Sequence, residues 1–222
     1  HRALSDVIRV IPNNATILTQ DRIFPHLASN INAYALPPVT ARLEKVYWKI
    51  VETLKSIEYE YIIIDPLMDV DTAVFIVKEF VENRSYSLAG FSDAALLFGK
   101  GKTNLKVNKP AIFYFRNLIP AGGRVVSDSS STFGKTIAYK PMYYYRDVVW
   151  FGPYVILPPG AYSVTFRIKA KNVSDNLLIT LDVVSEKGKK LLALRNVYGD
   201  EIPEGVWVNI TFSFFTASYE YY

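Results

Sequence analysis

The spacing of apolar side chains changes partway along the chain, and this change restricts the folds that the chain can adopt. In the last third, apolar and polar residues alternate with a period of two. The first apolar row comprises Tyr162, Val164, Phe166, Ile168 and Ala170, and the intervening polar row comprises Ser163, Thr165, Arg167, Lys169 and Lys171. Strands of this kind bury one face only, as in antiparallel sheets.

Two further rows have the same period. They comprise Leu177, Ile179, Leu181 and Val183, and then Val206, Val208, Ile210, Phe212 and Phe214. Between them, the segment SEKGKK has the composition of a hairpin turn. These strands predict an all-β domain over residues 111–222, an antiparallel β-sandwich of the jelly-roll type. The chain stops at YEYY, where we expect one more strand, so the sandwich is expected either to lack its last strand or to be completed by something else.

The first hundred residues have a different pattern. Apolar residues recur with helical spacing in 3–11 and 41–57, and a further helix is expected over 71–83. Short apolar runs, ATILTQ, NAYAL and YEYIIID, lie between the helices as strands, and YSLAGF and AALLFGKG form a hairpin around residues 92–93. Strands separated by helices predict a small Rossmann-like α/β domain over residues 1–100, mostly parallel with an antiparallel edge.

The junction between the two regions is predicted at residues 101–110. This stretch is basic, rich in small residues and ends in proline, which is typical of a linker. The lysines in and beside it are Lys100, Lys102, Lys106 and Lys109. They offer charge for an anionic surface, but a solvated linker is the simpler interpretation.

Composition excludes several classes of protein. The 222 residues include no cysteine, so disulfides, zinc–thiolate sites and thiol catalysis are excluded. The 25 basic residues are scattered among 21 acidic ones, which argues against a nucleic-acid surface. Apolar runs are far shorter than the ~18 residues of a membrane span. Because the chain starts at His1 and opens directly into a helix, we expect a fragment or processed product whose membrane anchor lies outside it.

Four N-x-S/T sequons are candidate glycan acceptors. They are at Asn14, Asn83, Asn172 and Asn209. Asn209 falls on the polar row of its strand and Asn172 in a turn, so both are expected to be accessible. The sequons favour an extracellular or cell-surface location.

The segment DPLMDVD carries three acids with two interpretations. Asp65 ends a strand, where open α/β sheets place ligands, and Asp69-Val70-Asp71 has the spacing with which some nucleotide-sugar transferases hold a divalent cation. Alternatively, Asp65 begins a turn before Pro66 and Asp71 caps a helix. The second interpretation is favoured, so no cofactor is predicted beyond a candidate divalent cation site at Asp65, Asp69 and Asp71.

A sugar-binding face is predicted among the aromatic residues of the β domain. Candidate ligand residues are Trp207, Tyr144, Trp150, Arg146 and Asp147, because aromatic faces stack on sugar rings and polar groups bond the hydroxyls. Trp207 is the most specific candidate, because alternation places it outside the core. Core packing is the alternative for the other aromatics. His26, near Asp21, is a candidate general base, but no nucleophile motif accompanies it, and no catalytic residue is predicted.

The first hundred residues resemble the soluble tail of a family of predicted multi-pass membrane proteins similar to GT-C glycosyltransferases. The resemblance lies in ALSDVIRVIPNNATILTQDRIFPHLASNINAYALP, YEYIIIDP and YSLAGFSDAALLFGKG, which occur in that order. It implies an extracytoplasmic part of a membrane protein, with any transferase chemistry in loops outside this chain.

The second half is similar to galactose-binding-like jelly rolls, which often serve as carbohydrate-binding modules. The matching segments are GGRVVSDSSSTFGKTIAYKP, GPYVILPPGAYSVTFRIKAKN and VWVNITFSF. Three roles are therefore expected in this order. They are a non-catalytic surface region that binds glycans or neighbouring proteins, an acceptor-site accessory region of a membrane glycosyltransferase, and a self-assembling surface protein.

Overall fold

The computed structural model describes residues 2–82, 84–101, 108–109, 113, 116–140 and 148–221. The chain forms two compact units, His1–Val155 and Ile156–Tyr222. The predicted linker, residues 101–110, falls within the first unit. Its residues 102–107 and 110 lie outside the described part of the chain, and Asn108–Lys109 pair with a strand.

A mixed six-stranded sheet forms the centre of the first unit, with the strand order β2-β1-β3-β5-β4-β6. The first three are parallel neighbours, and β5 and β4 form an antiparallel hairpin beside β3. The strands are β1 (Ile17–Gln20), β2 (Ala33–Leu36), β3 (Tyr61–Ile64), β4 (Tyr86–Ser92), β5 (Ala95–Lys100) and β6 (Asn108–Lys109). The predicted α/β order, including the closing hairpin, is confirmed.

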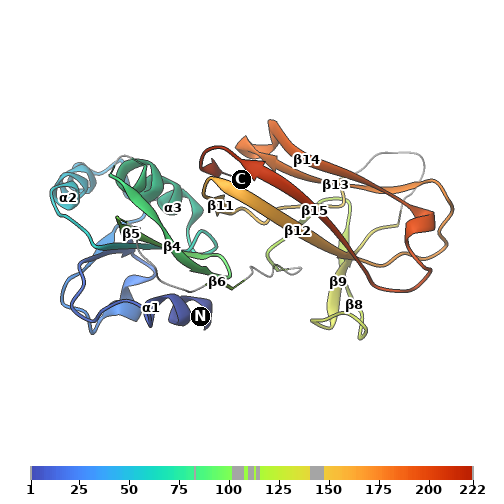
Figure 1. Ribbon diagram of the computed structural model, residues 1–222, viewed down its shortest axis with the longest axis horizontal. Coiled ribbons are helices and arrows are strands. Elements are labelled where there is room, and N and C mark those ends of the chain that lie inside the picture. The colour runs from blue at the N-terminus through green and yellow to red at the C-terminus, as the bar shows by residue number, and fades with distance from the viewer. Residues whose placement is uncertain are drawn as a thin grey trace. The chain divides into compact units, whose positions relative to one another are not determined.

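Helices cover both faces of this sheet (Figure 1). They are α1 (Arg2–Ile8), α2 (Lys45–Lys55) and α3 (Val70–Ile76), which continues as a π-helix, η3 (Val77–Val81), with short 3₁₀ turns η1 (Phe24–Leu27) and η2 (Val39–Ala41). On one face, Leu4 and Val7 of α1 pack with Ile17, Ile63 and Leu97 of the sheet. Because strand side chains alternate, neighbouring residues such as Leu18 and Ile62 belong to the opposite face, where α2 and α3 lie.

Two predictions about helix starts are wrong. The helix predicted from residue 41 begins at Lys45, after Glu44 in extended conformation. As a result Leu43 lies in a turn and is 93% exposed, while Tyr47, Val51 and Leu54 are buried as predicted. The cap of α3 is Asp69 rather than Asp71, because the Asp69 carboxylate accepts hydrogen bonds from Thr72 N (3.1 Å) and Thr72 Oγ1 (2.7 Å).

Short antiparallel pairs complete the described part of the first unit. β8 (Arg124–Ser127) pairs with β9 (Lys135–Ala138), and β7 (Ile119–Pro120) pairs with β10 (Trp150–Phe151). The β8–β9 turn is closed by Asp128, whose carboxylate accepts hydrogen bonds from Ser130 N and Ser130 Oγ.

The second unit consists of antiparallel two-stranded ribbons. β12 (Gly160–Ile168) pairs with β15 (Val208–Thr216), β13 (Leu177–Ser185) with β14 (Lys190–Tyr198), and β11 (Ile156–Leu157) with β16 (Glu220–Tyr221). The predicted hairpin turn between β13 and β14 is confirmed as η4 (Glu186–Gly188), and η5 (Gly199–Glu201) follows β14. The backbone at Gly199 passes close to the backbone at Ser174, since a Cβ added at Gly199 would lie 1.8 Å from Ser174 O.

The predicted alternation is observed along β12 and β15. Val164, Phe166, Ile210 and Phe212 are half-buried, and the residues between them are exposed. Three residues at the ends of the predicted apolar rows differ from the prediction. Val206 precedes β15 and is 50% exposed, Ala170 lies beyond the end of β12, and Leu177 is 46% exposed next to an irregularity in the β13–β14 register.

Within the described residues, no helix is long and apolar enough to cross a membrane.

Candidate functional site

The outer face of the β12–β15 ribbon carries a row of cross-strand polar pairs. Ser163 lies opposite Ser213 and Thr165 opposite Thr211, with the hydroxyl oxygens 3.1 Å and 2.8 Å apart. The next pair along the row is Arg167 and Asn209. All of these side chains are exposed. The ribbon therefore presents hydroxyl, amide and guanidinium groups in a line that follows the strand direction.

Aromatic residues lie at both ends of this row. Trp207 is half-buried at one end, and Phe215, opposite Ala161, is 66% exposed at the other. They are eight positions apart in extended chain, which corresponds to about 26 Å. We call the row from Trp207 to Phe215, with its β12 partners, the polar face. The two long strands lie side by side in Figure 1.

Two cations lie near the Trp207 indole. The Arg167 guanidinium carbon is 5.5 Å from the ring centroid and Lys169 Nζ is 4.9 Å from it, both within cation–π distance. Strand alternation explains the arrangement, since positions 167 and 169 point to the same side of β12. The Trp207 end of the polar face therefore combines an aromatic ring with two basic side chains.

The local backbone brings Trp207 to this position. Gly205 has a φ of 72°, a conformation that favours glycine, and its N–H donates to Ala170 O at 2.8 Å. Val206 N donates to Pro203 O at 3.1 Å, which closes the turn. The chain thereby enters β15 beside the end of β12, and Trp207 falls on the outer row between Lys169 and Asn209.

The other predicted sugar-binding residues belong to the first unit or lie outside the described residues. Trp150 is on β10 in the first unit, paired with Pro120, whereas Trp207 belongs to the second unit. Tyr144, Arg146 and Asp147 lie outside the described residues, as do Tyr143 and Tyr145. Phe215 was missed by the sequence analysis, although its position on the row of Trp207 and Asn209 was available as a signal.

The acids of DPLMDVD have structural partners. Asp69 caps α3, and Asp65 Oδ1 accepts a hydrogen bond from Leu67 N at 3.0 Å, which forms the turn after β3. Burial raises the pKa of Asp65, opposed by the Leu67 N–H, and the charge of Asp93 raises this pKa further. Asp71 is exposed in the first turn of α3. Across the described residues, no group of three or more His, Cys, Asp or Glu is placed to hold a metal ion.

Gln20 holds the same loop and was missed by the sequence analysis. Its side chain is fully buried at the end of β1; Oε1 accepts from Asp65 N and Nε2 donates to Asp69 O, both at 2.6 Å. On the exposed side, Arg22 Nη1 donates to Met68 O at 2.8 Å. Side chains at and just after the carboxyl end of β1 thus hold the backbone of the loop from Asp65 to Asp69, which suits a structural role.

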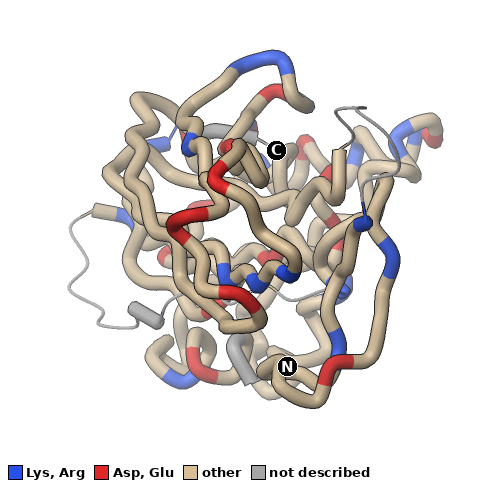
Figure 2. Tube along the Cα trace, turned by 90° about the vertical axis from the view of Figure 1, so that its right-hand side faces the viewer, with Lys and Arg blue, Asp and Glu red and all other residues tan. Residues whose placement is uncertain are grey.

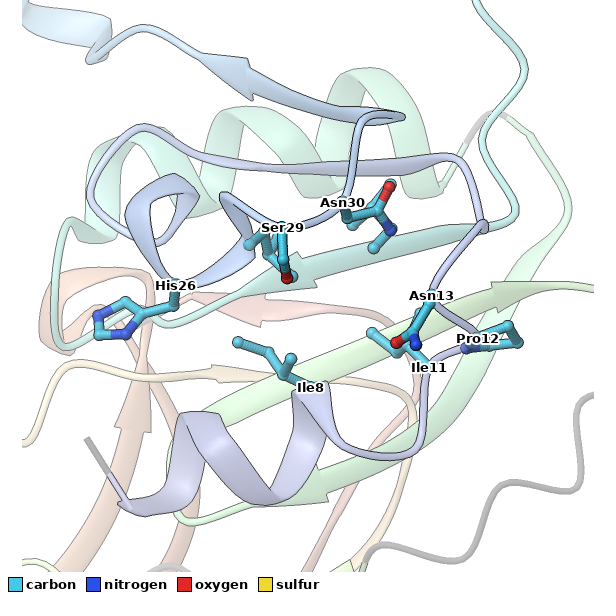
Figure 3. Close-up of a pocket in the computed structure, with 9 residues that line it drawn as sticks. Ile8, Ile11, Pro12, Asn13, His26, Ser29 and Asn30 are labelled. Carbon is cyan, nitrogen blue, oxygen red and sulfur yellow. The ribbon is translucent and has the colours of Figure 1, made fainter.

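His26 lies at one end of a small pocket under η1, and Pro12 and Asn13 lie at the other (Figure 3). The pocket has a volume of about 50 Å³, and much of its lining is apolar, including Ile8, Ile11 and Leu27. This volume is enough for a water molecule or two and too small for a sugar. His26 itself is exposed.

Three sequons are accessible. Asn14 and Asn209 are exposed, and Asn172 is exposed in a turn with a φ of 54°. The backbone N–H of Asn172 donates to Glu204 Oε1 at 3.0 Å. Asn83 lies outside the described residues.

Comparisons with protein-family models, with curated proteins and with solved structures found no match to this chain. The resemblances to GT-C transferase tails and to galactose-binding-like jelly rolls therefore stay predictions. Of the polar face, the capped acids and the small pocket, the polar face is the one with exposed polar groups between two aromatic side chains.

Proposed function

We propose that this chain is a non-catalytic, extracytoplasmic binding region whose polar face binds saccharides. The observation that carries the proposal is the row of exposed hydroxyl, amide and guanidinium groups between Trp207 and Phe215 on one ribbon. Along the rest of the trace, basic and acidic residues are interspersed (Figure 2). Charge alone therefore does not favour another surface as the binding site.

The chemistry of this face suits a sugar chain. An aromatic ring offers an apolar surface for the C–H groups of a pyranose, and serine, threonine and asparagine side chains both donate and accept hydrogen bonds. Trp207 and Phe215 are about 26 Å apart along the strand direction. This separation suits a linear oligosaccharide that places one sugar ring at Trp207 and another at Phe215.

The proposed fold of the second unit is a two-layer sandwich of the jelly-roll type. The β12–β15 and β13–β14 ribbons would form its layers, with Leu181 and Val197 between them. Both of these side chains are buried, at 3% and 0% exposure, and the inner row of β12 and β15 is half-buried. This arrangement leaves the polar face outward.

A binding role is favoured over catalysis by how the acids are used. Asp69 is bonded to Thr72, and Asp65 is bonded to the backbone of its own turn. An extracytoplasmic location is supported by the exposure of Asn14 and Asn172, two sequon asparagines that lie away from the polar face. Anchoring by membrane segments outside this chain is part of the proposal.

Glycan-array screening followed by calorimetric titration tests the proposed function. Wild type is expected to bind at least one oligosaccharide class, and Trp207→Ala is expected to weaken that binding about tenfold or more, since a stacked aromatic anchor is lost. Phe133→Ala is the matched control, because Phe133 is 49% exposed in the first unit. Loss of binding in both variants, or no binding by wild type, would contradict the proposal.

A second candidate function, self-assembly, is favoured by the exposed apolar side chains of the β13–β14 ribbon. Five large side chains of this ribbon are exposed at 40–56%: Leu177, Leu178, Leu191, Leu194 and Tyr198. Burying apolar area of this kind between two copies would be favourable. Light scattering tests it: an oligomer that Leu194→Lys converts to a monomer supports the role, and a wild-type monomer at all concentrations overturns it.

A further inference from the structure

Exposed apolar and basic side chains lie together at the start of α2, in the first unit. Leu43, in the turn before the helix, is 93% exposed, and Val46 and Trp48 in the first helical turn are 63% and 47% exposed. Three basic side chains of the same stretch are also exposed. We call this set the α2 patch; it consists of Arg42, Leu43, Lys45, Val46, Trp48 and Lys49. The helix lies at the periphery of the first unit (Figure 1).

Helical geometry places the two lysines at the centre of the outward side of α2. Tyr47 is buried, and Lys45 and Lys49 are each about 160° around the helix axis from it. Val46 and Trp48 are about 100° from Tyr47 on opposite sides, so they border the lysines. The outward side therefore carries cations flanked by apolar side chains.

Aromatic neighbours hold the Trp48 indole in its exposed position. Its ring centroid lies 5.3 Å from that of Tyr47 and 6.3 Å from that of Phe75 in α3, with interplanar angles of 89° and 63°. A side chain that is already ordered loses little conformational entropy when a partner covers it.

The stretch around the α2 patch is positively charged. Residues 42–49 contain three basic residues and one acidic residue, Glu44, so their net charge is +2. Among the described residues, no ion pair involves Arg42, Lys45 or Lys49, whereas Lys55 at the end of the same helix pairs with Glu79 at 2.7 Å. An anionic partner would therefore meet cations that the first unit has not already neutralised.

We propose that the α2 patch binds to the surface of an anionic lipid bilayer. Leu43 and Val46 enter the boundary between headgroups and acyl chains, and Trp48 lies at the headgroup level, where indoles are favoured. The lysine stems extend along this boundary and place their ammonium groups beside lipid phosphates. The proposal does not rest on the polar face, which belongs to the second unit.

The mixture of charge and apolar area favours a bilayer over two other partners. A two-fold interface with a second copy would bring the cations of both patches together, and like charges repel. A nucleic acid would neutralise the cations through its phosphates but would leave Leu43 and Val46 in water. A bilayer with anionic lipids accepts both kinds of side chain.

Sedimentation of the full chain with lipid vesicles tests the proposal. Wild type is expected to bind vesicles of phosphatidylcholine with about 30% phosphatidylserine at least tenfold more tightly than vesicles of phosphatidylcholine alone. Lys45→Gln/Lys49→Gln is expected to weaken binding to the anionic vesicles about tenfold, since two cations are lost. Leu43→Asn is expected to weaken it severalfold, since less apolar area leaves water.

Two variants are matched controls and are expected to bind as wild type does. Ile31→Asn makes a similar change at a side chain that is 92% exposed, at the opposite end of β2 from the turn that leads to α2. Lys171→Gln/Lys189→Gln removes the same charge from exposed positions of the second unit. Losses in these controls as large as those in the patch variants would overturn the proposal.

The other outcomes of the vesicle test also decide the matter. No binding by wild type, or equal binding to both kinds of vesicle, overturns the proposal. Binding of poly-glutamate without binding of vesicles assigns the patch to an acidic protein and overturns it as well. A dimer that Leu43→Asn dissociates, in protein that binds no vesicles, assigns the patch to a second copy.

Fluorescence of Trp48 locates the contact even if the lysine variant does not fold. Phosphatidylcholine brominated on its acyl chains quenches an indole at the boundary between headgroups and acyl chains. Wild type is expected to lose fluorescence on binding anionic vesicles that contain this lipid. Trp48→Phe, which keeps an aromatic ring beside Tyr47 and Phe75, is expected to lose a much smaller fraction. Equal fractional quenching of the two proteins would overturn the proposal.

Discussion

Asn209 lies directly opposite Arg167 in the β12–β15 ladder, two positions from Trp207 on the same face of the ribbon. A glycan attached to Asn209 would therefore stand on the polar face next to Trp207. Asn172, in contrast, lies in a turn beyond the end of β12. Glycosylation of Asn209 and saccharide binding by the polar face thus exclude one another.

This relationship makes a prediction for protein made in a glycosylating host. If Asn209 carries a glycan, saccharide binding is expected to be absent until the glycan is removed enzymatically, because the glycan covers Arg167 and Trp207. Mass spectrometry of the peptides establishes occupancy, and calorimetry before and after treatment measures binding. Asn172→Gln protein is the control. Undiminished binding by chains fully occupied at Asn209 would contradict the proposed site.

Phe215 is expected to matter only for longer ligands. It lies about 26 Å from Trp207 along β15, so a short oligosaccharide held at Trp207 does not reach it. Phe215→Ala is expected to leave disaccharide affinity unchanged and to weaken binding of oligomers that span the face by several-fold. Titration with a series of chain lengths checks this. A uniform loss at every length would point to a folding defect instead.

Two buried tyrosines of the first unit are expected to respond oppositely to loss of the hydroxyl. Tyr59 Oη donates to Leu54 O at 2.8 Å, while the Tyr47 hydroxyl is buried with no hydrogen-bond partner among the described residues. Tyr59→Phe is expected to lower the free energy of unfolding by about 1 kcal/mol, and Tyr47→Phe to leave it unchanged or raise it. Urea denaturation measures both. Equal losses would contradict the described environment of Tyr47.

Asp65 is expected to shape the acid range of the stability profile. Burial raises its pKa in the folded chain above the value of about 4 expected when unfolded. The contribution of Asp65 to the free energy of unfolding is then fully present below its pKa in the unfolded chain. This contribution is lost as the pH rises through its pKa in the folded chain. Asp65→Asn, which keeps an oxygen acceptor for Leu67 N, removes this loss. The free energy of unfolding of the variant should therefore rise relative to that of wild type between pH 4 and neutrality. A difference between the two free energies that stays constant over that pH range would refute this.

Local pattern was enough to predict most elements of this chain. Alternation predicted β12 and β15 and the outward position of Trp207, because a strand with one buried face repeats every two residues. Helical spacing predicted α2 but not its start, since Leu43 satisfies the period without being in the helix. The sequence predicted Asp71 as the cap of α3, but the extended backbone of Asp69 lets the Asp69 carboxylate reach Thr72, and Asp69 is the cap.

Contacts between residues that are far apart in the chain could not be predicted from the sequence. The bonds from Gln20 to Asp65 and Asp69 join positions 45 and 49 residues apart, and no local spacing encodes them. Prediction of the polar face likewise required the register of β12 against β15, which pairs Arg167 with Asn209. Alternation places Phe215 on the outer row, but its position opposite Ala161 followed from that register.

The chain has three tryptophans, and a titration followed by ¹⁵N NMR of their indole N–H signals tests the central claim most directly. Addition of a bound oligosaccharide is expected to shift the signal of Trp207 and to leave those of Trp48 and Trp150 unchanged, with each signal assigned from its Trp→Phe variant. A saccharide that binds while the Trp207 signal stays fixed would contradict the account.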